Sequence, residues 1–217
     1  MLYFLTFYSM KKQLAILVSA LLLTTGCEQA NQAKESYTAL AKLGEAGKEM
    51  SANLEKAKDE RTEREKRGDT LSLPYKELQQ YLPTEVSGYK AGELSGQSQK
   101  MTGMAFSTAE REFTNGEEEV KVSVVDYNGS NALYQGAAAM MALGMEQEDD
   151  EHIMGPTTLK IDGVKGMETY YKKEGRAEMM LAVGGRFLVT LSGQKQKDMG
   201  LLKSVAEDMD LEKLAKM

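Results

Sequence analysis

Apolar and polar residues alternate most clearly on either side of a short turn in the middle of the chain. Phe106 to Phe113 and Val120 to Tyr127 alternate with a period of two, which is typical of half-buried β-strands. Between them lies Thr114-Asn115-Gly116-Glu117, and Asn-Gly favours a two-residue hairpin because both turn residues adopt positive φ. The pattern predicts a hairpin in which Val120, Val122 and Val124 share a buried face with Ala109 and Phe113. The predicted register pairs Phe113 with Glu118, Arg111 with Val120, Ala109 with Val122 and Ser107 with Val124.

The pattern predicts further strands and helices on both sides of this hairpin. Helices are expected where apolar residues recur every three or four positions, and strands where short apolar runs end at turns that contain glycine. These turns are Asp162-Gly163, Glu174-Gly175 and Gly184-Gly185. The expected helices are Tyr75–Tyr81, Asn131–Glu146 and Asp198–Asp208, and the expected strands are Tyr89–Leu94, Thr158–Ile161, Lys165–Tyr171, Ala177–Val183 and Arg186–Leu191.

The order of these elements predicts an α+β fold, because strands are followed by a helix and then again by strands and a helix. The short hairpins predict an antiparallel β-sheet, with the helices packed mainly on one face. The same order indicates a weak twofold repeat of a unit of three strands and a helix. We expect this globular domain to span residues 71–217.

A charged region precedes the predicted domain. Residues 28–67 are rich in Ala, Glu, Lys and Gln and contain no proline, which favours helix. From Lys56 to Arg67 nearly every residue is charged, which is typical of a solvated surface. We therefore expect residues 27–70 to form a helical stalk or linker that ends near Gly68.

The N-terminal residues have the organisation of a secretory leader. Met10-Lys11-Lys12-Gln13 is basic, Leu14 to Leu23 is apolar, and Thr24-Thr25-Gly26-Cys27 ends the segment with small residues. The basic residues stand in the expected place if translation starts at Met10; an unusually long leader from Met1 is the alternative. We expect residues 1–26 to be a signal peptide.

The leader resembles the lipobox of bacterial membrane lipoproteins through Leu23-Thr24-Thr25-Gly26-Cys27, in which the leucine lies one position further from the cysteine than is usual. The resemblance implies cleavage between Gly26 and Cys27 and lipid attachment to Cys27, the only cysteine. Several acyl chains anchor a protein stably. The resemblance therefore implies a domain outside the cytoplasm, held by lipid at the cell membrane. If the organism is Gram-negative, Glu28 rather than Asp after the lipidated residue resembles lipoproteins of the outer membrane, with the domain on the periplasmic side. An ordinary leader with an accidental or buried cysteine remains the alternative.

Composition and charge restrict the partners. Loss of the leader removes two of the 27 Lys and Arg residues and none of the 33 Asp and Glu residues, so the formal net charge falls from −6 to −8. An acidic chain without a basic stripe argues against nucleic acid as a partner. Beyond the leader no apolar run approaches the roughly 20 residues of a membrane-spanning helix.

The sequence contains little that is typical of an active site. His152 is the only histidine and lies in a polar loop, no serine has the context of a nucleophile elbow, and Gly184-Gly185 precedes a strand rather than a helix. We therefore expect no enzyme activity and no cofactor. The favoured interpretation is a non-catalytic binding or accessory domain for an envelope protein or a small ligand.

Two alternatives stay open. One is an enzyme whose site residues are scattered through the fold. The other is a metal-handling protein, because thioether ligands suit Cu(I) and five candidate ligands stand close together in the sequence. Buried methionine also commonly fills gaps in a core. The candidate ligands are Met140, Met141, Met145, His152 and Met154.

Overall fold

The computed structural model describes residues 48, 51–52, 55–56, 58–102, 104–142 and 144–217. Residues Lys48–Met217 form one compact unit. The predicted leader, the cleavage and lipidation residues Gly26 and Cys27, and much of the predicted stalk lie outside the described residues. Residues 58–66 are helical. No helix among the described residues is both long enough and apolar enough to cross a membrane.

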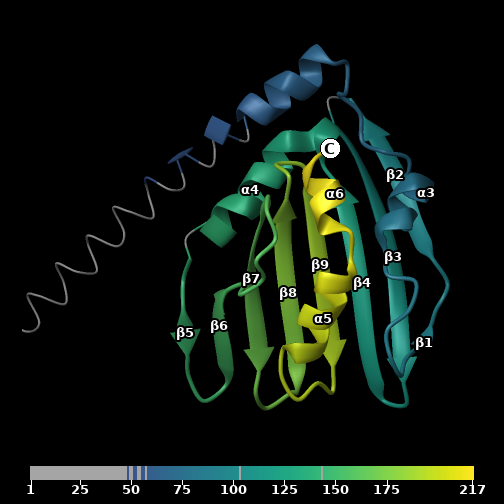
Figure 1. Ribbon diagram of the computed structural model, residues 1–217, viewed down its shortest axis with the longest axis vertical. Helices are drawn as coiled ribbons and strands as arrows, with labels where there is room; N and C mark the ends of the chain where they lie inside the picture. Colours follow the sequence, from purple (N-terminus) through teal and green to yellow (C-terminus); the bar gives the residue numbers. More distant parts are fainter. Residues whose placement is uncertain (1–47, 49–50, 53–54, 57, 103, 143) are drawn as a thin grey trace, which may run out of the picture. The chain divides into compact units, whose positions relative to one another are not determined.

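A nine-stranded antiparallel sheet forms the centre of the domain, as the α+β prediction requires (Figure 1). Its strand order is β1-β3-β4-β9-β8-β7-β6-β5, and β2 also pairs with β3. The helices and 3-10 turns are α3 (Tyr75–Leu78), η1 (Gln79–Tyr81), η2 (Asn128–Ser130), α4 (Asn131–Ala142), α5 (Gly200–Asp208) and α6 (Leu211–Ala215). The strands are β1 (Lys90–Ala91), β2 (Ser95–Met101), β3 (Met104–Asn115), β4 (Glu118–Asp126), β5 (Gln147–Glu148), β6 (His152–Pro156), β7 (Val164–Tyr171), β8 (Arg176–Val183) and β9 (Phe187–Gln194).

The β3–β4 hairpin confirms the predicted buried face but not the predicted register. Ala109, Phe113, Val120, Val122 and Val124 are all fully buried. The pairing is shifted by two residues, however, so that Phe113 lies opposite Val120. The even shift preserves which side chains share a face. It also places Arg111 opposite Val122, Ala109 opposite Val124 and Ser107 opposite Asp126.

The shift arises at the turn, where the two loop residues are Gly116 and Glu117 rather than Asn115 and Gly116. Asn115 still belongs to β3 and pairs with Glu118. Gly116 has a φ of 62°, and Lys195 is the only described non-glycine residue with positive φ. Glycine at the first loop position with negative φ at the second is the requirement of a type II′ turn. The sequence prediction assumed a type I′ turn instead.

Three helices cover one face of the sheet. In Figure 1, α5 and α6 lie in front of β8 and β9, and α3 lies in front of β3. Leu78 of α3, Leu202 of α5 and Leu214 of α6 are buried in the main core. They pack with the inward-facing side chains of the central strands, among them Val122, Leu181, Val189 and Leu191.

Helix α4 packs on the opposite face. Its residues Tyr134 and Met141 form a smaller cluster with Ala182, and Leu188 packs against this cluster. Ala182 and Leu188 alternate with Leu181 and Val189 of the main core, so they point to the other side of the sheet. The helix ends at Ala142 instead of Glu146, since Gly144 has a φ of 55° and leaves the helical conformation.

Several predicted elements are confirmed within a few residues, including β7, β8, β9, α3 and α5. The predicted strand Thr158–Ile161 is wrong, because β6 ends at Pro156 and residues 158–161 form no strand. Past Pro156 the Glu168 carboxylate accepts hydrogen bonds from the Thr157 hydroxyl and the Thr158 amide. Strand β2 was not predicted, since all seven of its residues are exposed and its sequence lacks an apolar alternation.

The predicted twofold repeat is visible in the order of strands. At the centre β4 pairs antiparallel with β9, and β3 and β8 lie on their outer sides, followed by β2 and β7. Two three-stranded meanders are therefore joined back to back. The helices break the symmetry, because α4 and α5 follow equivalent strands but pack on opposite faces.

The turn at Gly116 supplies a test of the register. Gly116→Val should lower the free energy of unfolding by about 1 kcal/mol or more, because a β-branched residue resists positive φ. Urea denaturation of the purified protein measures the change.

Asn115→Thr is the matched control, since Asn115 has negative φ and lies in a strand. We expect its stability to stay within about 0.5 kcal/mol of wild type. A large loss at Asn115 as well as at Gly116 would place the turn where the sequence analysis put it, because both residues have positive φ in that turn.

Candidate binding pocket and its polar support

A pocket of about 450 Å³ opens at the end of the sheet where β7 begins and β8 ends. It lies between α4, the end of α6, the loops before β7 and after β8, and the helical residues near 56–60. Small-molecule sites commonly have volumes of about 300–1,000 Å³, so the pocket has the size of a ligand site. Its lining residues are Lys56, Glu60, Tyr134, Gln135, Ala138, Ala139, Ile161, Asp162, Gly163, Val164, Lys165, Ala182, Gly184, Gly185, Ala215 and Lys216.

Two glycines allow the loops to approach α6 closely and so form one wall of the pocket. A Cβ on Gly184 would lie 2.7 Å from the Ala215 carbonyl oxygen, and a Cβ on Gly163 would lie 2.8 Å from the Ala215 Cβ. Both glycines also have positive φ. Any other residue would be strained at these positions and would displace the end of α6.

Tyr134 of α4 contributes a buried ring to the pocket, with 5% of its surface exposed. Burial raises the pKa of its hydroxyl to about 12, and the negative charge of Glu60 acts in the same direction. A hydrogen bond with the Gly185 backbone and the charge of Arg64 partly oppose this rise in pKa. The hydroxyl therefore stays protonated at neutral pH and ties α4 to the loop after β8.

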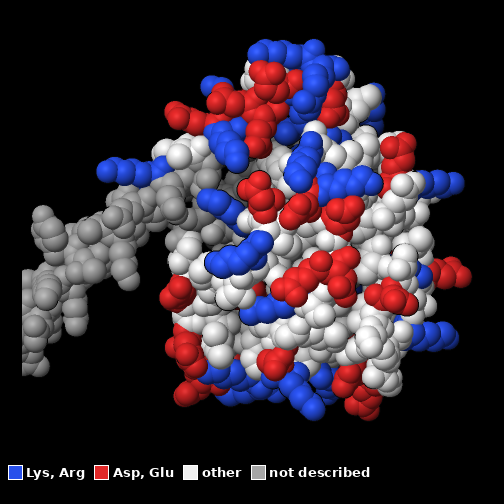
Figure 2. Space-filling model, in the orientation of Figure 1, with Lys and Arg blue, Asp and Glu red and all other residues white. Residues whose placement is uncertain are grey.

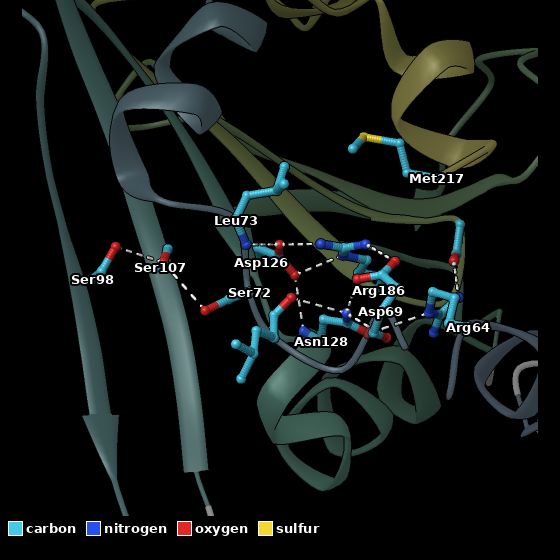
Figure 3. Close-up of polar contacts among 12 residues, drawn as sticks. Arg64, Asp69, Ser72, Leu73, Ser98, Ser107, Asp126, Asn128, Arg186 and Met217 are labelled. Atoms are coloured by element: carbon cyan, nitrogen blue, oxygen red, sulfur yellow. Dashed lines mark hydrogen bonds and ion pairs between the residues drawn. The ribbon is translucent and has the colours of Figure 1, made fainter. Parts of the chain in front are cut away.

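Arg186, in the same loop, forms a buried ion pair with Asp126 (Figure 3). Arg186 Nε donates to Asp126 Oδ1 at 2.9 Å, and Nη2 donates to Asp126 Oδ2 at 2.7 Å. The remaining nitrogen, Nη1, donates to Asp69 Oδ2 at 2.8 Å. Arg186 is 2% exposed and Asp126 is fully buried. Burial lowers the pKa of Arg186, but the hydrogen bonds and charges of Asp126 and Asp69 outweigh it and raise the pKa above its ordinary value.

Backbone and amide groups complete the hydrogen bonding of the two carboxylates. Asp126 accepts from the Leu73 amide at 2.7 Å and from the Asn128 amide at 2.9 Å. The Asn128 side chain donates to Asp69 Oδ1 at 2.8 Å and to the Leu71 carbonyl at 3.0 Å. Across the described residues every buried side-chain nitrogen and oxygen has a partner. A buried pair satisfied in this way holds its neighbours in one geometry.

Arg64 connects this cluster to the pocket. Its Nε donates to Asn128 Oδ1 at 3.2 Å, and Nη2 and Nη1 donate to the carbonyls of Gly185 and Gly184 at 3.2 and 3.5 Å. Burial lowers the pKa of Arg64 below its ordinary value, and the nearby charge of Arg186 adds to this effect. Because both glycines line the pocket, Arg64 fixes that wall from outside.

Two residues of the predicted linker therefore contact the domain. Arg64 is 4% exposed, and the Asp69 carboxylate binds Arg186. Both precede residue 71, where the sequence analysis placed the start of the domain. The helical residues 58–66 and the segment up to Leu73 share hydrogen bonds with the sheet.

Basic and acidic side chains surround the mouth of the pocket. Lys56 lies 3.8 Å from Glu60, and Lys216 lies 3.5 Å from Glu212, with all four side chains substantially exposed. Lys165 and Asp162 complete the charged residues of the lining. Figure 2 shows positive and negative side chains next to one another on the visible face of the domain. The mouth therefore has three cations and two anions among its lining residues.

A second, more open groove of about 660 Å³ lies beside α5, near the edge strands β5 and β6. It contains Glu168, whose Oε2 lies 2.9 Å from Lys203 Nζ. The other oxygen of Glu168 accepts from Thr157 and Thr158. Because these polar groups already bind one another and support the loop after β6, we regard this groove as structural.

The residues of the metal hypothesis occupy different surroundings. Met141 is buried against Tyr134 and Ala182, and Met145 is exposed. His152 Nδ1 lies 3.2 Å from Asp149, and Met154 lies beside the second groove. Within the part of the chain that the structure describes, no group of three His, Cys, Asp or Glu residues could hold a metal ion. The side chain of Met140 is outside that part, so copper binding by this set stays a prediction.

The sequence analysis did not identify the buried pair, although one signal was present. Asp126 continues the inward-facing series Val120, Val122 and Val124 of β4. A charged residue at a core position requires a partner of opposite charge. The alternation of β4 therefore identifies Asp126 as a charged residue at a core position, but nothing in the pattern identifies Arg186 as its partner.

Comparison with known proteins leaves the family open. No protein-family model and no curated protein matches this chain. Among solved structures, the chain is similar to an uncharacterised protein from Mycobacterium smegmatis, with 8% sequence identity and a TM-score of 0.28. That similarity covers 56% of this chain and 88% of the other. A TM-score this low establishes neither a shared fold nor a shared function.

The ion pair supplies the first test of this site. Arg186→Met should lower the free energy of unfolding by about 3–5 kcal/mol, because it leaves Asp126 buried without a counter-ion. Arg176→Met is the control, since Arg176 pairs with Glu174 and Glu178 at the surface and should cost about 1 kcal/mol or less. The double variant Asp126→Leu/Arg186→Met should recover at least about 1 kcal/mol relative to Arg186→Met. A double variant that is less stable than the single one would contradict this account of the charges.

Tyr134 supplies a second test, through pH. Its folded-state pKa of about 12 is above the ordinary value of 10.0. The protonated hydroxyl therefore contributes stability that is complete below pH 10 and is lost as the pH rises towards 12. Tyr134→Phe should remove this part of the pH dependence. Urea midpoints between pH 9 and pH 12 measure the change, and identical slopes for Tyr134→Phe and wild type would disprove the assignment.

Proposed function

We propose that this chain is a lipid-anchored cell-envelope protein whose α+β domain binds a ligand in the pocket between α4 and α6, without catalysing a reaction. The proposal that the domain binds a ligand is based on this pocket. It is enclosed by segments that are distant in sequence, and its wall is held by Arg64 and by glycines that allow close packing. A preformed concave site with a mainly apolar interior is the usual form of a small-molecule site.

The titration behaviour of the described residues supports binding rather than acid–base catalysis. General acids and bases work best with a pKa near the working pH. The resolved shifts lower the pKa of Glu63 and Asp149, and raise it for lysine and tyrosine groups such as Lys121 and Tyr127. Each of these shifts moves the group further from neutrality, and the lowered pKa of Arg64 belongs to a guanidinium already bound to Asn128 and to the carbonyls of Gly184 and Gly185. The pocket hydroxyl of Tyr134 follows the same trend.

The proposal of a lipid anchor is based on the predicted leader and on Cys27. The basic start, the apolar stretch and the small residues before the only cysteine support removal of residues 1–26 and acylation of residue 27. Residues 28–47 lie in the sequence between the proposed lipid site and the compact unit that begins at Lys48. A domain held in this way works next to a membrane surface without entering it.

Metabolic labelling tests the anchor. Cells that express the full chain should incorporate an alkyne-bearing fatty acid into it, and the protein should fractionate with membranes. Cys27→Ser should remove the label, because the proposed lipid attachment is to the Cys27 sulfur. Glu28→Gln, one residue away, should keep the label. Equal labelling of the Cys27→Ser variant and wild type would disprove lipid attachment at this residue.

A further inference from the structure

We infer that the pocket between α4 and α6 binds a single-chain amphiphile whose tail is apolar and whose head carries a negative charge, such as an alkyl carboxylate. The inference rests on the proposed function, because it assumes that this pocket is the ligand site. Three features of the pocket lead to it: its interior, its mouth and its size.

The interior is suited to an apolar tail. Ala138 and Ala139 of α4 and Ala182 of β8 present small side chains, and Ile161 and Val164 add branched ones. The one hydroxyl there, that of Tyr134, is already hydrogen-bonded to the Gly185 backbone. The Gly184 and Gly185 carbonyls accept hydrogen bonds from Arg64, which does not line the pocket. A polar ligand would therefore have few free hydrogen-bonding groups to bind in the interior. A hydrocarbon chain, by contrast, is stabilised there because its apolar surface is removed from water.

The mouth is suited to an acidic head. It contains Lys56, Lys165 and Lys216 against two carboxylates, in a chain whose formal net charge is −6. The Lys56–Glu60 and Lys216–Glu212 pairs are long and exposed, and pairs of this kind contribute little to stability. Lys56 and Lys216 can therefore leave these ion pairs and contact a ligand at a small cost in free energy. Because the surroundings are mixed in charge, the head should strengthen binding only by a few-fold, with the tail providing most of the affinity.

The size of the pocket selects one chain rather than two. A volume of about 450 Å³ lies near the lower end of the range for small-molecule sites, which is about 300–1,000 Å³. A two-chain phospholipid would have to leave most of its hydrocarbon outside. The ligand is therefore a free single-chain amphiphile rather than a bilayer lipid.

Calorimetric titration tests the class of ligand. The protein is the mature chain from residue 27 as its Cys27→Ser variant, and the probes are dodecanoate, dodecanol and dodecylammonium below their aggregation concentrations. Dodecanoate should bind at least about threefold more tightly than dodecanol, and dodecylammonium should bind most weakly. Added salt should reduce the advantage of dodecanoate over dodecanol. Vesicles of anionic phospholipid, included as a further probe, should not compete with dodecanoate.

Paired variants locate the binding. Ala139→Leu fills the pocket and should weaken dodecanoate binding by at least about tenfold. Ala132→Leu, on the exposed side of the same helix, should not change it. Lys56→Gln/Lys216→Gln should bring dodecanoate to the affinity of dodecanol and leave dodecanol unchanged. Circular dichroism confirms that each variant is folded.

The outcomes separate the inference from the proposed function. If dodecanol binds as tightly as dodecanoate and Ala139→Leu blocks both, the charge assignment is overturned while a ligand pocket is supported. If no amphiphile binds, or if Ala132→Leu and Ala139→Leu behave alike, the inference fails as a whole. If phospholipid vesicles displace dodecanoate, the single-chain assignment is overturned. None of these results depends on the labelling of Cys27, which tests the anchor separately.

Discussion

The buried pair of Arg186 and Asp126 is the interaction on which the arrangement of this end of the domain depends. It lies where β4 ends and β9 begins, the two strands at the centre of the sheet. Two charges removed from water are stabilising only if their hydrogen bonds are complete. Asp126 therefore requires the amides of Leu73 and Asn128, and Arg186 requires the carboxylate of Asp69. Because this ion pair requires hydrogen bonds from Leu73 and Asp69, the segment that contains them packs against the sheet.

The same network shapes the pocket without contributing a side chain to its interior. Asn128 accepts from Arg64, and Arg64 holds the carbonyls of Gly184 and Gly185. The surface ion pairs of the domain contribute much less, because exposed pairs are screened and lose side-chain entropy. A disturbance at the buried pair should therefore reach the pocket wall, whereas loss of an exposed pair should stay local. Stability and ligand binding at this end of the sheet have a common structural origin.

The sequence predicted local features of the fold better than its long-range ones. Alternation in β3 and β4 identified the buried face, because side-chain parity is independent of small errors in register. The register itself was wrong by two residues, since Asn115-Gly116 and Gly116-Glu117 are both acceptable hairpin turns. Strand β2 was missed because its pairing with β3 depends on tertiary contacts, including the packing of Gly96 beneath Tyr75 and the hydrogen bond between Ser98 and Ser107. The pocket could not be predicted, because its lining comes from five separate segments and contains no motif.

The contacts of Arg64 and Asp69 also change how the charged N-terminal region is to be understood. A free linker would let the domain rotate independently of whatever precedes it. Here the end of that region is fixed, since Arg64 is buried and Asp69 binds the central ion pair. Glu60 and Lys56, about one and two turns before Arg64, line the pocket directly. The helical residues 58–66 are therefore part of the candidate binding site rather than of a free linker.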